Sequence, residues 1–452
     1  MERPAPRFLS TKKRNSYFWK ELQLLKDSKK VLIFTYYWPP SGGSGVQRWM
    51  YFTKYLKQLG WEPIVITVDE KQASYSVLDF ELLEQVKGIQ VIKTETKEPL
   101  KIYSQILTGS TNKGIPQGAI SKNGWFSKMA AFARGNFFIP DARKGWNTFA
   151  KIEAEKLIRQ QGIQKLITTG PPHSTHLVGL QLKAQFGIQW WADFRDPWND
   201  IFYNKDLYRS AWAKRIDAQW EEKVLQTADG ILTTVGGDLV RKFQIKAPYQ
   251  NFHVLPNGYD SPLISSTPKT QLIDFHVVYT GLLTENQDYL STIGVINTLA
   301  NQHQIRLSLA GNIAPKIIEK IKETANKIEV DYKGYLSHKE TISLMKSGDL
   351  LLNFVFRGAD RDMISGKLFE YLATAIPLLS IGDPHSEAAG LLAQASFAQM
   401  IDANDIDAQE IFIQKVAQLK GKARNILPEI ENWSREKITK ALNLIIEQGN
   451  IQ

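Results

Sequence analysis

The fold class is decided by residues 31–50, which read VLIFTYYWPPSGGSGVQRWM. Residues 31–35 form a short apolar run of the kind that builds buried strands in parallel sheets. A loop rich in proline and glycine follows, and apolar residues then recur near 3.6 spacing from Val46 to Leu59, which predicts a helix. Gly60 ends this helix, and residues 64–68 predict the next strand. The order strand, loop, helix, strand is typical of a doubly wound α/β domain.

The same alternation continues and predicts two Rossmann-like doubly wound domains that face a cleft. In the first half, strands are predicted at 165–169, 189–193 and 230–234, with helices at 147–160, 174–186 and 211–227. In the second half, strands are predicted at 276–280, 306–310, 329–333, 349–353 and 378–381, with helices at 337–347 and 366–375. We therefore divide the chain into an N-terminal extension at 1–29, a first domain at 30–260 with an insertion at 101–135, a linker at 261–275, a second domain at 276–432 and a final helix within 433–452.

The composition of the 452 residues excludes several classes of protein. At 43% hydrophobic and 23% charged residues the chain is an ordinary globular protein. It contains no cysteine, which excludes disulfides, cysteine-ligated zinc, iron–sulfur clusters and a thiol nucleophile. The chain contains no run of 18 apolar residues, so no membrane-spanning helix is predicted. The charged first 30 residues do not resemble a secretory signal. We therefore expect a cytoplasmic protein.

The net charge of +10 is concentrated in two segments, residues 1–30 and 101–150, each with a net charge of +6. Such a distribution favours one basic surface, whose partner is an anionic membrane, nucleic acid or an acidic ligand, although scattered solvated lysines remain the simpler explanation. No nucleic-acid-binding module is recognisable, so nucleic acid is not expected. Because the first segment also contains Phe8, Tyr17, Phe18 and Trp19, we expect peripheral attachment to the inner face of the cell membrane.

Two segments have the composition of a phosphate site. In the loop before the first helix, Gly42 and Gly43 let backbone N–H groups approach an anion closely, although a tight turn would also use glycine. The spacing fits neither a dinucleotide fingerprint nor a P-loop. In the second domain, Ser365, Gly366 and Lys367 open a helix, with Ser365 as its expected N-cap, and a lysine at that end favours an anion beside it.

Polar side chains also follow two strands of the first domain, where ligands of open α/β sheets bind. His173 and His176 stand three residues apart after one strand, but no third ligand at a suitable spacing supports a metal site, and a single histidine capping a loop is the alternative. Asp193, Arg195 and Asp196 follow the next strand among aromatic residues. They fit either a structural cluster of ion pairs or a site for sugar hydroxyls.

In their order and spacing, these segments resemble the GT-B glycosyltransferases of family 4, the retaining group 1 type. The resemblance covers about residues 30–450 and rests on Gly42-Gly43, on residues 254–258 (VLPNG) and on residues 367–373 (KLFEYLA). It extends to a bacterial subgroup with a start similar to TYYWPPSGGSGVQRW and segments similar to PPHSTH and ADFRDPW. What it implies is a nucleotide-sugar donor, held mainly by the second domain, and a final helix that crosses back to the first.

The resemblance also implies roles for single residues. The E-x7-E element of the family falls on Asp362 and Glu370, of which Glu370 would bind the donor ribose and Asp362 would order the loop or contact the sugar. The diphosphate would be held by Gly42, Gly43, Ser365, Gly366 and Lys367, with Arg361 nearby. His173 would be the active-site histidine, with His176 in reserve, and Asp193, Arg195 and Asp196 would lie on the sugar and acceptor side.

One departure from the family concerns the basic side chains that contact the diphosphate. The family often places an arginine and a lysine after the first strand of the second domain, whereas this chain has Leu282 and Gln287. Their role would pass to Lys367, Arg361, Arg357 and Arg48. The implied reaction is hexosyl transfer with retention, independent of a metal and of any cofactor, to a glycan or lipid-linked acceptor of envelope or exopolysaccharide synthesis. The alternatives are a sugar-nucleotide epimerase and a catalytically weak protein that binds a sugar nucleotide or a membrane surface.

Overall fold

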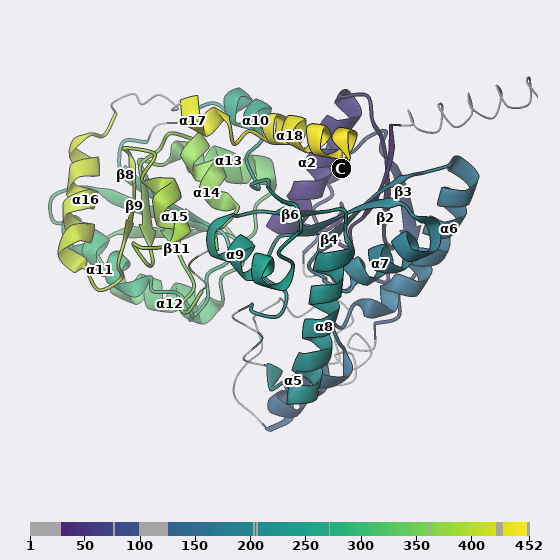
Figure 1. Ribbon diagram of the computed structural model, residues 1–452. Coiled ribbons are helices and arrows are strands. Elements are labelled where there is room, and N and C mark those ends of the chain that lie inside the picture. The colour runs from purple at the N-terminus through teal and green to yellow at the C-terminus, as the bar shows by residue number, and fades with distance from the viewer. Residues whose placement is uncertain are drawn as a thin grey trace, which may run out of the picture.

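The computed structural model describes residues 29–75, 77–98, 125–201, 204, 207–270, 272–359, 361, 363–421 and 428–449. It confirms the predicted fold class. Two parallel sheets, each with helices on both faces, form two domains that lie side by side (Figure 1). The predictions for residues 1–28 and 101–124, which carry much of the positive charge, lie outside the described residues.

The N-terminal domain contains a seven-stranded sheet in the order β3-β2-β1-β4-β5-β6-β7. Its strands are β1 (Lys30–Phe34), β2 (Glu62–Val68), β3 (Gln90–Thr94), β4 (Lys165–Gly170), β5 (Gln189–Phe194), β6 (Gly230–Thr233) and β7 (Phe252–Val254). Its helices are α2 (Ser44–Gln58), α3 (Leu82–Gln85), α5 (Trp125–Phe137), η1 (Lys144–Trp146), α6 (Asn147–Gln161), α7 (Thr175–Phe186), α8 (Ala211–Thr227) and α9 (Gly237–Lys246). Helix α5 is the described part of the insertion, and it projects below the sheet beside α8 (Figure 1).

The C-terminal domain contains a six-stranded sheet in the order β10-β9-β8-β11-β12-β13. Its strands are β8 (Phe275–Thr280), β9 (Ile305–Ala310), β10 (Glu329–Tyr332), β11 (Leu350–Phe354), β12 (Leu378–Ile381) and β13 (Ala398–Ile401). Its helices are α11 (Leu290–Leu299), α12 (Pro315–Thr324), α13 (His338–Ser347), α14 (Lys367–Ala373), α15 (Glu387–Leu392), α16 (Ile406–Gln418) and α17 (Pro428–Glu431).

Strand β1 shows why a continuous apolar run is needed in such a sheet. Leu32 and Phe34 pack into the core under α6 and α7, whereas Val31 and Ile33 pack into the core on the opposite face, which α2 covers. All four side chains are fully buried. Because alternate residues of a strand point to opposite faces, a strand with helices on both sides needs apolar residues at every position.

Two further helices lie in the chain segments that connect the domains. Helix α10 (Ser261–Ser266) lies in the segment predicted as a linker, and its Ile264 is buried in the core of the C-terminal domain. Helix α18 (Arg435–Gln448) packs beside α2 across the N-terminal domain (Figure 1). Its buried side chains Ile438, Leu442 and Ile446 belong to the core of that domain.

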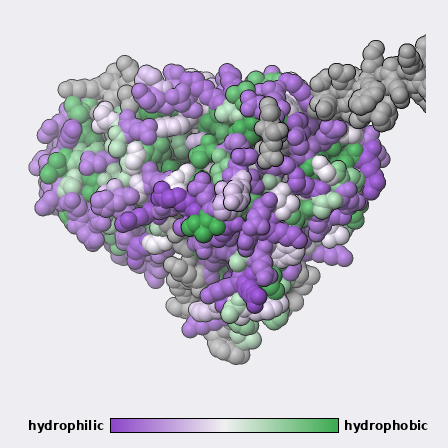
Figure 2. All heavy atoms as spheres, in the orientation of Figure 1, coloured by the Kyte–Doolittle hydropathy of each residue, from purple (hydrophilic) through white to green (hydrophobic). Residues whose placement is uncertain are grey.

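No helix among the described residues is long and apolar enough to cross a membrane. Hydrophilic residues cover much of the visible face, apolar residues also appear on both domains, and pale or apolar residues lie on the lower projection (Figure 2). Exposed apolar side chains of α5 and of the start of α8 belong to this projection, namely Met129, Phe132, Phe137, Tyr208 and Trp212.

Candidate functional site

Three loops at the carboxyl ends of β1, β4 and β5 meet around Arg195. Its guanidinium donates hydrogen bonds to the carbonyls of Gly45, at the start of α2, of Gly170, the last residue of β4, and of Pro171. The segments that the sequence singled out separately are therefore joined. Because each of its three nitrogens donates to a backbone carbonyl, Arg195 holds the loops in place.

Asp193 is a structural residue, so the predicted contact with a sugar is not supported. It is fully buried and pairs with Arg48, whose Nη2 lies 2.7 Å from its Oδ1. Its second oxygen accepts hydrogen bonds from Trp49 Nε1 and Thr169 Oγ1, each at 2.7 Å. Every approach to this carboxylate is therefore filled by protein. Arg48 is equally committed, which removes it from the candidate diphosphate ligands.

The two histidines after β4 lie in an aromatic pocket. His173 stacks on Trp198 with a centroid distance of 5.1 Å, and His176 stacks on Phe194 at 4.6 Å. Burial lowers the pKa of His173 well below its ordinary value, and the neighbouring His176 and Arg195 lower it further. Burial also lowers the pKa of His176 to about 3, with Arg195 contributing. Both imidazoles are therefore neutral at pH 7.

The histidines differ in access. His176 is completely buried, and its Nδ1 lies 2.8 Å from Thr168 Oγ1, so the structure does not support its reserve role as a sugar contact. His173 retains 8% of its exposure, and neither of its ring nitrogens has a hydrogen-bond partner among the described residues. No group of three metal-ligating side chains is found in the described part of the chain. Beside these loops, burial raises the pKa of Asp196, against the effect of Arg195.

Lys367, the first residue of α14, is the only one of the four substitute cations with no ion-pair partner among the described residues. Its ammonium lies 4.4 Å from the centre of the Tyr279 ring and 3.2 Å from the carbonyl oxygen of Thr280, to which it donates. Burial lowers its pKa to about 7. Arg361 pairs with Asp383, and Arg357 pairs with Asp288.

The start of α14 differs in detail from the prediction. Gly366 occupies the N-cap position and no side chain caps the helix, so Ser365 is not the N-cap, although it is exposed beside it. The expectation of a serine cap fails because the chain enters the helix one residue later. Arg361 is exposed, and the prediction for Asp362 lies outside the described residues.

Glu370, one turn along α14, is buried and already has partners. His338 Nε2 lies 2.8 Å from its Oε1, and Arg435 Nη2 lies 3.2 Å from the same atom. Burial alone would raise the pKa of Glu370, but His338 and Arg435 together lower it below its usual value. The sequence reasoning missed both partners, because His338 and Arg435 lie in other elements and belong to no local pattern.

The glycine loop reaches the second domain. A Cβ atom on Gly42 would lie 2.8 Å from the hydroxyl oxygen of Tyr335, which follows β10, so no larger residue fits there without displacing that side chain. Gly43 has a φ of +91°, in the region that favours glycine. The loop and α14 thus belong to opposite domains, and each lies at the domain boundary: Gly42 against Tyr335, and Gly366 against Asn257.

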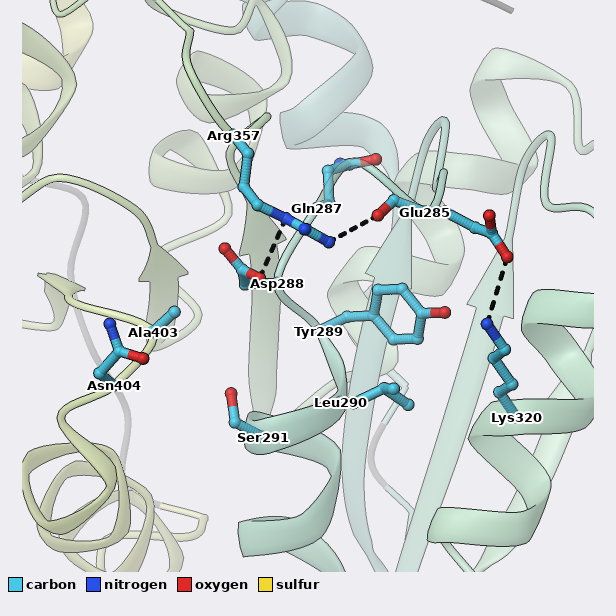
Figure 3. Close-up of a pocket in the computed structure, with 10 residues that line it drawn as sticks. All are labelled: Glu285, Gln287, Asp288, Tyr289, Leu290, Ser291, Lys320, Arg357, Ala403 and Asn404. Atoms are coloured by element: carbon cyan, nitrogen blue, oxygen red, sulfur yellow. Dashed lines mark hydrogen bonds and ion pairs between the residues drawn. The ribbon is translucent and has the colours of Figure 1, made fainter. Parts of the chain in front are cut away.

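The loop after β8 explains the departure at Leu282 and Gln287. Gln287 is buried and braces the loop, since its Nε2 donates to Phe354 O at 2.8 Å and its Oε1 accepts from Thr284 N at 2.9 Å. A pocket of about 280 Å³ opens beside it, and Figure 3 shows Arg357 crossing this pocket toward Asp288. The charges in this pocket are paired with one another, since Lys320 also pairs with Glu285. The loop supplies no unpaired cation of its own among the described residues.

No protein-family model matches the sequence, and no curated protein matches it. Solved structures do match. A glycosyltransferase of Rickettsia africae is similar with a TM-score of 0.59 at 14% identity, over 93% of this chain and 98% of that chain. The HepE protein of Anabaena in complex with UDP is similar with a TM-score of 0.59 at 10% identity, over 93% of this chain and 100% of that chain.

A third likeness is to a protein of Listeria monocytogenes assigned as a UDP-N-acetylglucosamine 2-epimerase. Its TM-score is 0.54 at 10% identity, over 93% of this chain and 96% of that chain. At such low identities the likenesses establish the fold and nothing narrower. The two Rossmann-like domains and the helix that crosses back to the first show that this chain has the GT-B fold.

Proposed function

We propose that this protein is a glycosyltransferase of the retaining, metal-independent, hexosyltransferase type. It moves a sugar from a nucleotide-sugar donor to a glycan or lipid-linked acceptor in cell-envelope or exopolysaccharide synthesis. The observation that carries the proposal is Lys367, a half-buried lysine with no carboxylate partner among the described residues, at the start of the helix that carries Glu370. A buried cation without a counter-ion favours an anionic ligand, and a diphosphate fits that requirement.

In the proposed donor site, Lys367 and the backbone amides near Gly366 bind the diphosphate, and Gly42 and Gly43 face it from the other domain. Glu370, kept ionised by its two partners, accepts hydrogen bonds from the ribose. Support for UDP as the nucleotide comes from the Anabaena protein of the same fold, whose structures contain UDP and UDP-glucose. Arg361 lies at the edge of this site, where Asp383 holds it.

In the proposed reaction the bond between the sugar C1 and the diphosphate oxygen breaks, and a bond from C1 to the acceptor oxygen forms on the same face. The acceptor proton passes to the departing phosphate oxygen, so no carboxylate base is needed. Lys367 stabilises the negative charge that develops on the leaving diphosphate. His173, neutral and partly accessible after β4, contacts the transferred sugar through a ring nitrogen.

The donor site is tested by calorimetric titration of the whole protein with UDP, GDP, ADP and their sugar conjugates. We expect one nucleotide to bind and K367A to weaken that binding by about 10- to 100-fold, the range for loss of a hydrogen bond to a charged group. K322A, which removes an exposed lysine of α12, is the matched control and should bind normally. Failure of every nucleotide to bind, or normal binding by K367A, would contradict the proposal.

A sugar-nucleotide epimerase is the second candidate, favoured by the likeness to the Listeria protein. The two activities differ in their need for an acceptor. Incubation of the protein with a sugar nucleotide alone, followed by NMR of the sugar, should give no epimer if transfer is the function. With a glycan acceptor, the anomeric signal of the product reports retention. Binding without any turnover would leave the third possibility, a catalytically weak binding protein.

The proposal also places the enzyme in the cytoplasm, peripheral on the inner face of the membrane. The support is the projection formed by α5 and the start of α8. Its exposed apolar side chains, among them Phe137 and Trp212, lie among exposed basic residues, namely Lys128, Lys144, Lys214 and Arg215. Exposed aromatics beside basic residues are typical of surfaces that bind anionic lipid.

Co-sedimentation with vesicles tests this placement. We expect the protein to bind vesicles containing phosphatidylglycerol at low salt, and the variant F137A/W212A to bind at least about fivefold more weakly. I245A/Y249A, which removes two side chains that are even more exposed, at the end of α9 and just after it, is the matched control. Equal binding by the two variants would remove the projection as the membrane surface.

A further inference from the structure

One buried guanidinium, that of Arg435, joins the two domains at the candidate donor site. It is the first residue of α18 and is only 4% exposed. Its Nη2 donates to Gln47 of α2 at 2.5 Å and to Glu370 of α14 at 3.2 Å. Its Nε donates to the carbonyl of Asn257 at 3.4 Å. Side chains from the N-terminal domain and from the C-terminal domain thus share one cation.

Arg435 lies where the chain enters the N-terminal domain through α18, whereas Glu370 lies on α14 of the C-terminal domain. The apolar face of α18 is buried in the N-terminal core against α2, and the Arg435 guanidinium lies 4.2 Å from the centre of the Tyr51 ring on α2. Glu370 is fixed in the core of the C-terminal domain by its helix, whose neighbours Phe369 and Tyr371 are buried there. The contact between Arg435 and Glu370 therefore crosses the boundary between the domains, next to Trp433, whose ring packs on Phe369 of α14.

Arg435 also has a donor to spare. Its Nη1 is buried and has no hydrogen-bond partner among the described residues. An unpaired buried donor on a charged group destabilises the folded protein, so such groups persist where a ligand or another function uses them. This atom stands beside the carboxylate to which the ribose is assigned above.

The groups around Glu370 show how Arg435 affects the protonation of this carboxylate. The groups that face this carboxylate are His338 from α13, Arg435 from α18, and the hydroxyls of Tyr51 and Tyr371. Burial would raise the pKa of Glu370, and the two basic side chains reverse that effect. Without Arg435, the buried carboxylate of Glu370 keeps one histidine as its basic partner. The fraction of Glu370 that is protonated then rises as the pH falls.

We infer that Arg435 is a positioning residue that presents Glu370 to the ribose of the donor only when the two domains are closed. This inference rests on the proposed function and adds to it the means by which closure is linked to nucleoside recognition. Helix α18 is the mechanical link, because it is built into the N-terminal core while its first residue holds a side chain of the other domain. The buried Nη1 is available to a ribose hydroxyl in the same closed state.

The test measures discrimination for the ribose hydroxyls. UDP, GDP and ADP are titrated in turn into the full chain, and the one that binds is compared with its 2′,3′-dideoxy analogue. The ratio of the two dissociation constants isolates the ribose, because the diphosphate and Lys367 contribute to both. We expect a ratio of about 10 or more in the native protein, the value of a hydrogen bond to a charged group.

In R435Q the ratio of the two dissociation constants should fall to within about threefold of unity at pH 6, because Glu370 becomes protonated there. At pH 8, where Glu370 is ionised again, the ratio should recover in part. R435K should retain an intermediate ratio. E370Q should lose the preference for the ribose hydroxyls at every pH. The double variant R435Q/E370Q should lose no more of this preference than E370Q does. R306Q, which removes an arginine paired with carboxylates on the C-terminal sheet, should keep the native ratio.

Q47A tests the link to closure, because it removes a side-chain hydrogen bond between α2 and Arg435 and leaves Glu370 untouched. A lowered ratio in Q47A supports the link, and it also keeps the test informative if R435Q does not fold. The inference is overturned if E370Q loses discrimination while R435Q, R435K and Q47A all keep it, or if the native protein binds a nucleotide without preferring its ribose form. If no nucleoside diphosphate binds the native protein, the proposed function itself fails, which is a different result.

Discussion

At the scale of single residues, Lys367 and Glu370 lie one turn apart on α14 and differ in whether oppositely charged side chains surround them. Lys367 has an aromatic ring and a carbonyl beside it and no carboxylate partner among the described residues. Glu370 has two basic partners. Burial lowers the pKa of Lys367 to about 7, so the free protein holds this lysine near half-charged at neutral pH. A bound diphosphate would restore its charge.

Nucleotide binding should therefore take up a proton above pH 7. At pH 8 a lysine of pKa about 7 is roughly nine-tenths neutral, so binding of UDP should take up about 0.9 proton, against far less at pH 6. Calorimetry in buffers of different ionisation enthalpy measures this number. K367R is the control, because arginine stays charged at both pH values and should take up no proton there. Equal uptake by K367R would show that another group is responsible.

At the scale of elements, the pair of Arg48 and Asp193 ties α2 to the end of β5. Arg48 Nη1 also donates to the carbonyl oxygen of Leu255 at 2.7 Å, so one side chain fastens a helix to two strand ends. Both side chains are at most 2% exposed. In such a setting the loss of one partner leaves an unpaired buried charge, and this is more harmful than the loss of both.

D193N should therefore destabilise the N-terminal domain by about 3–5 kcal/mol, the usual effect of breaking a buried ion pair. Urea unfolding followed by tryptophan fluorescence measures the change, since Trp49 and Trp191 lie in this domain. E436A, which removes one partner of an exposed pair with Lys440, should change stability by less than about 0.5 kcal/mol. A stable D193N with weakened sugar binding would instead restore the role that the sequence indicated.

At the scale of the whole molecule, two neighbouring chain segments connect the domains. Tyr259, on the way out of the N-terminal domain, forms a parallel bridge with Ser434, on the way back. Gly258 allows this approach, since a Cβ there would lie 2.4 Å from the carbonyl oxygen of Trp433. A second contact between the domains is made where the amide of Asp238, in the first turn of α9, donates to Glu387 of α15 at 3.0 Å. Two adjacent connecting segments and a contact at α9 and α15 are the arrangement of a hinge between two domains.

Closure can be followed directly, because the chain has no cysteine and accepts labels at chosen sites. Spin labels on Q160C of α6 and K322C of α12, both exposed, report the distance between the domains. We expect a broad distribution in the free protein and a single narrow one with a bound nucleotide. E387A should broaden the free distribution further. An identical distribution with and without nucleotide would contradict a closing cleft.

The sequence by itself determined the fold class and most of the strands, because buried parallel strands are continuous apolar runs that need no knowledge of their neighbours. It missed β3, β7 and β13, which all lie at the edge of a sheet, where fewer apolar residues are required. It also indicated Lys367, Glu370 and the glycine loop, since helix starts and glycines are local signals.

Only the tertiary structure decided which charges are paired and which are left for a ligand. Asp193 looked like a partner of Arg195 but binds Arg48, 145 residues away, and Glu370 is held by Arg435, 65 residues further on. The first contact depends on α2 packing beside the end of β5, and the second depends on the chain returning through α18 to the first domain, which no local pattern specifies. A pKa or an exposed fraction is set by everything that surrounds a group, so the chemistry of each side chain follows from the fold and not from its neighbours in the sequence.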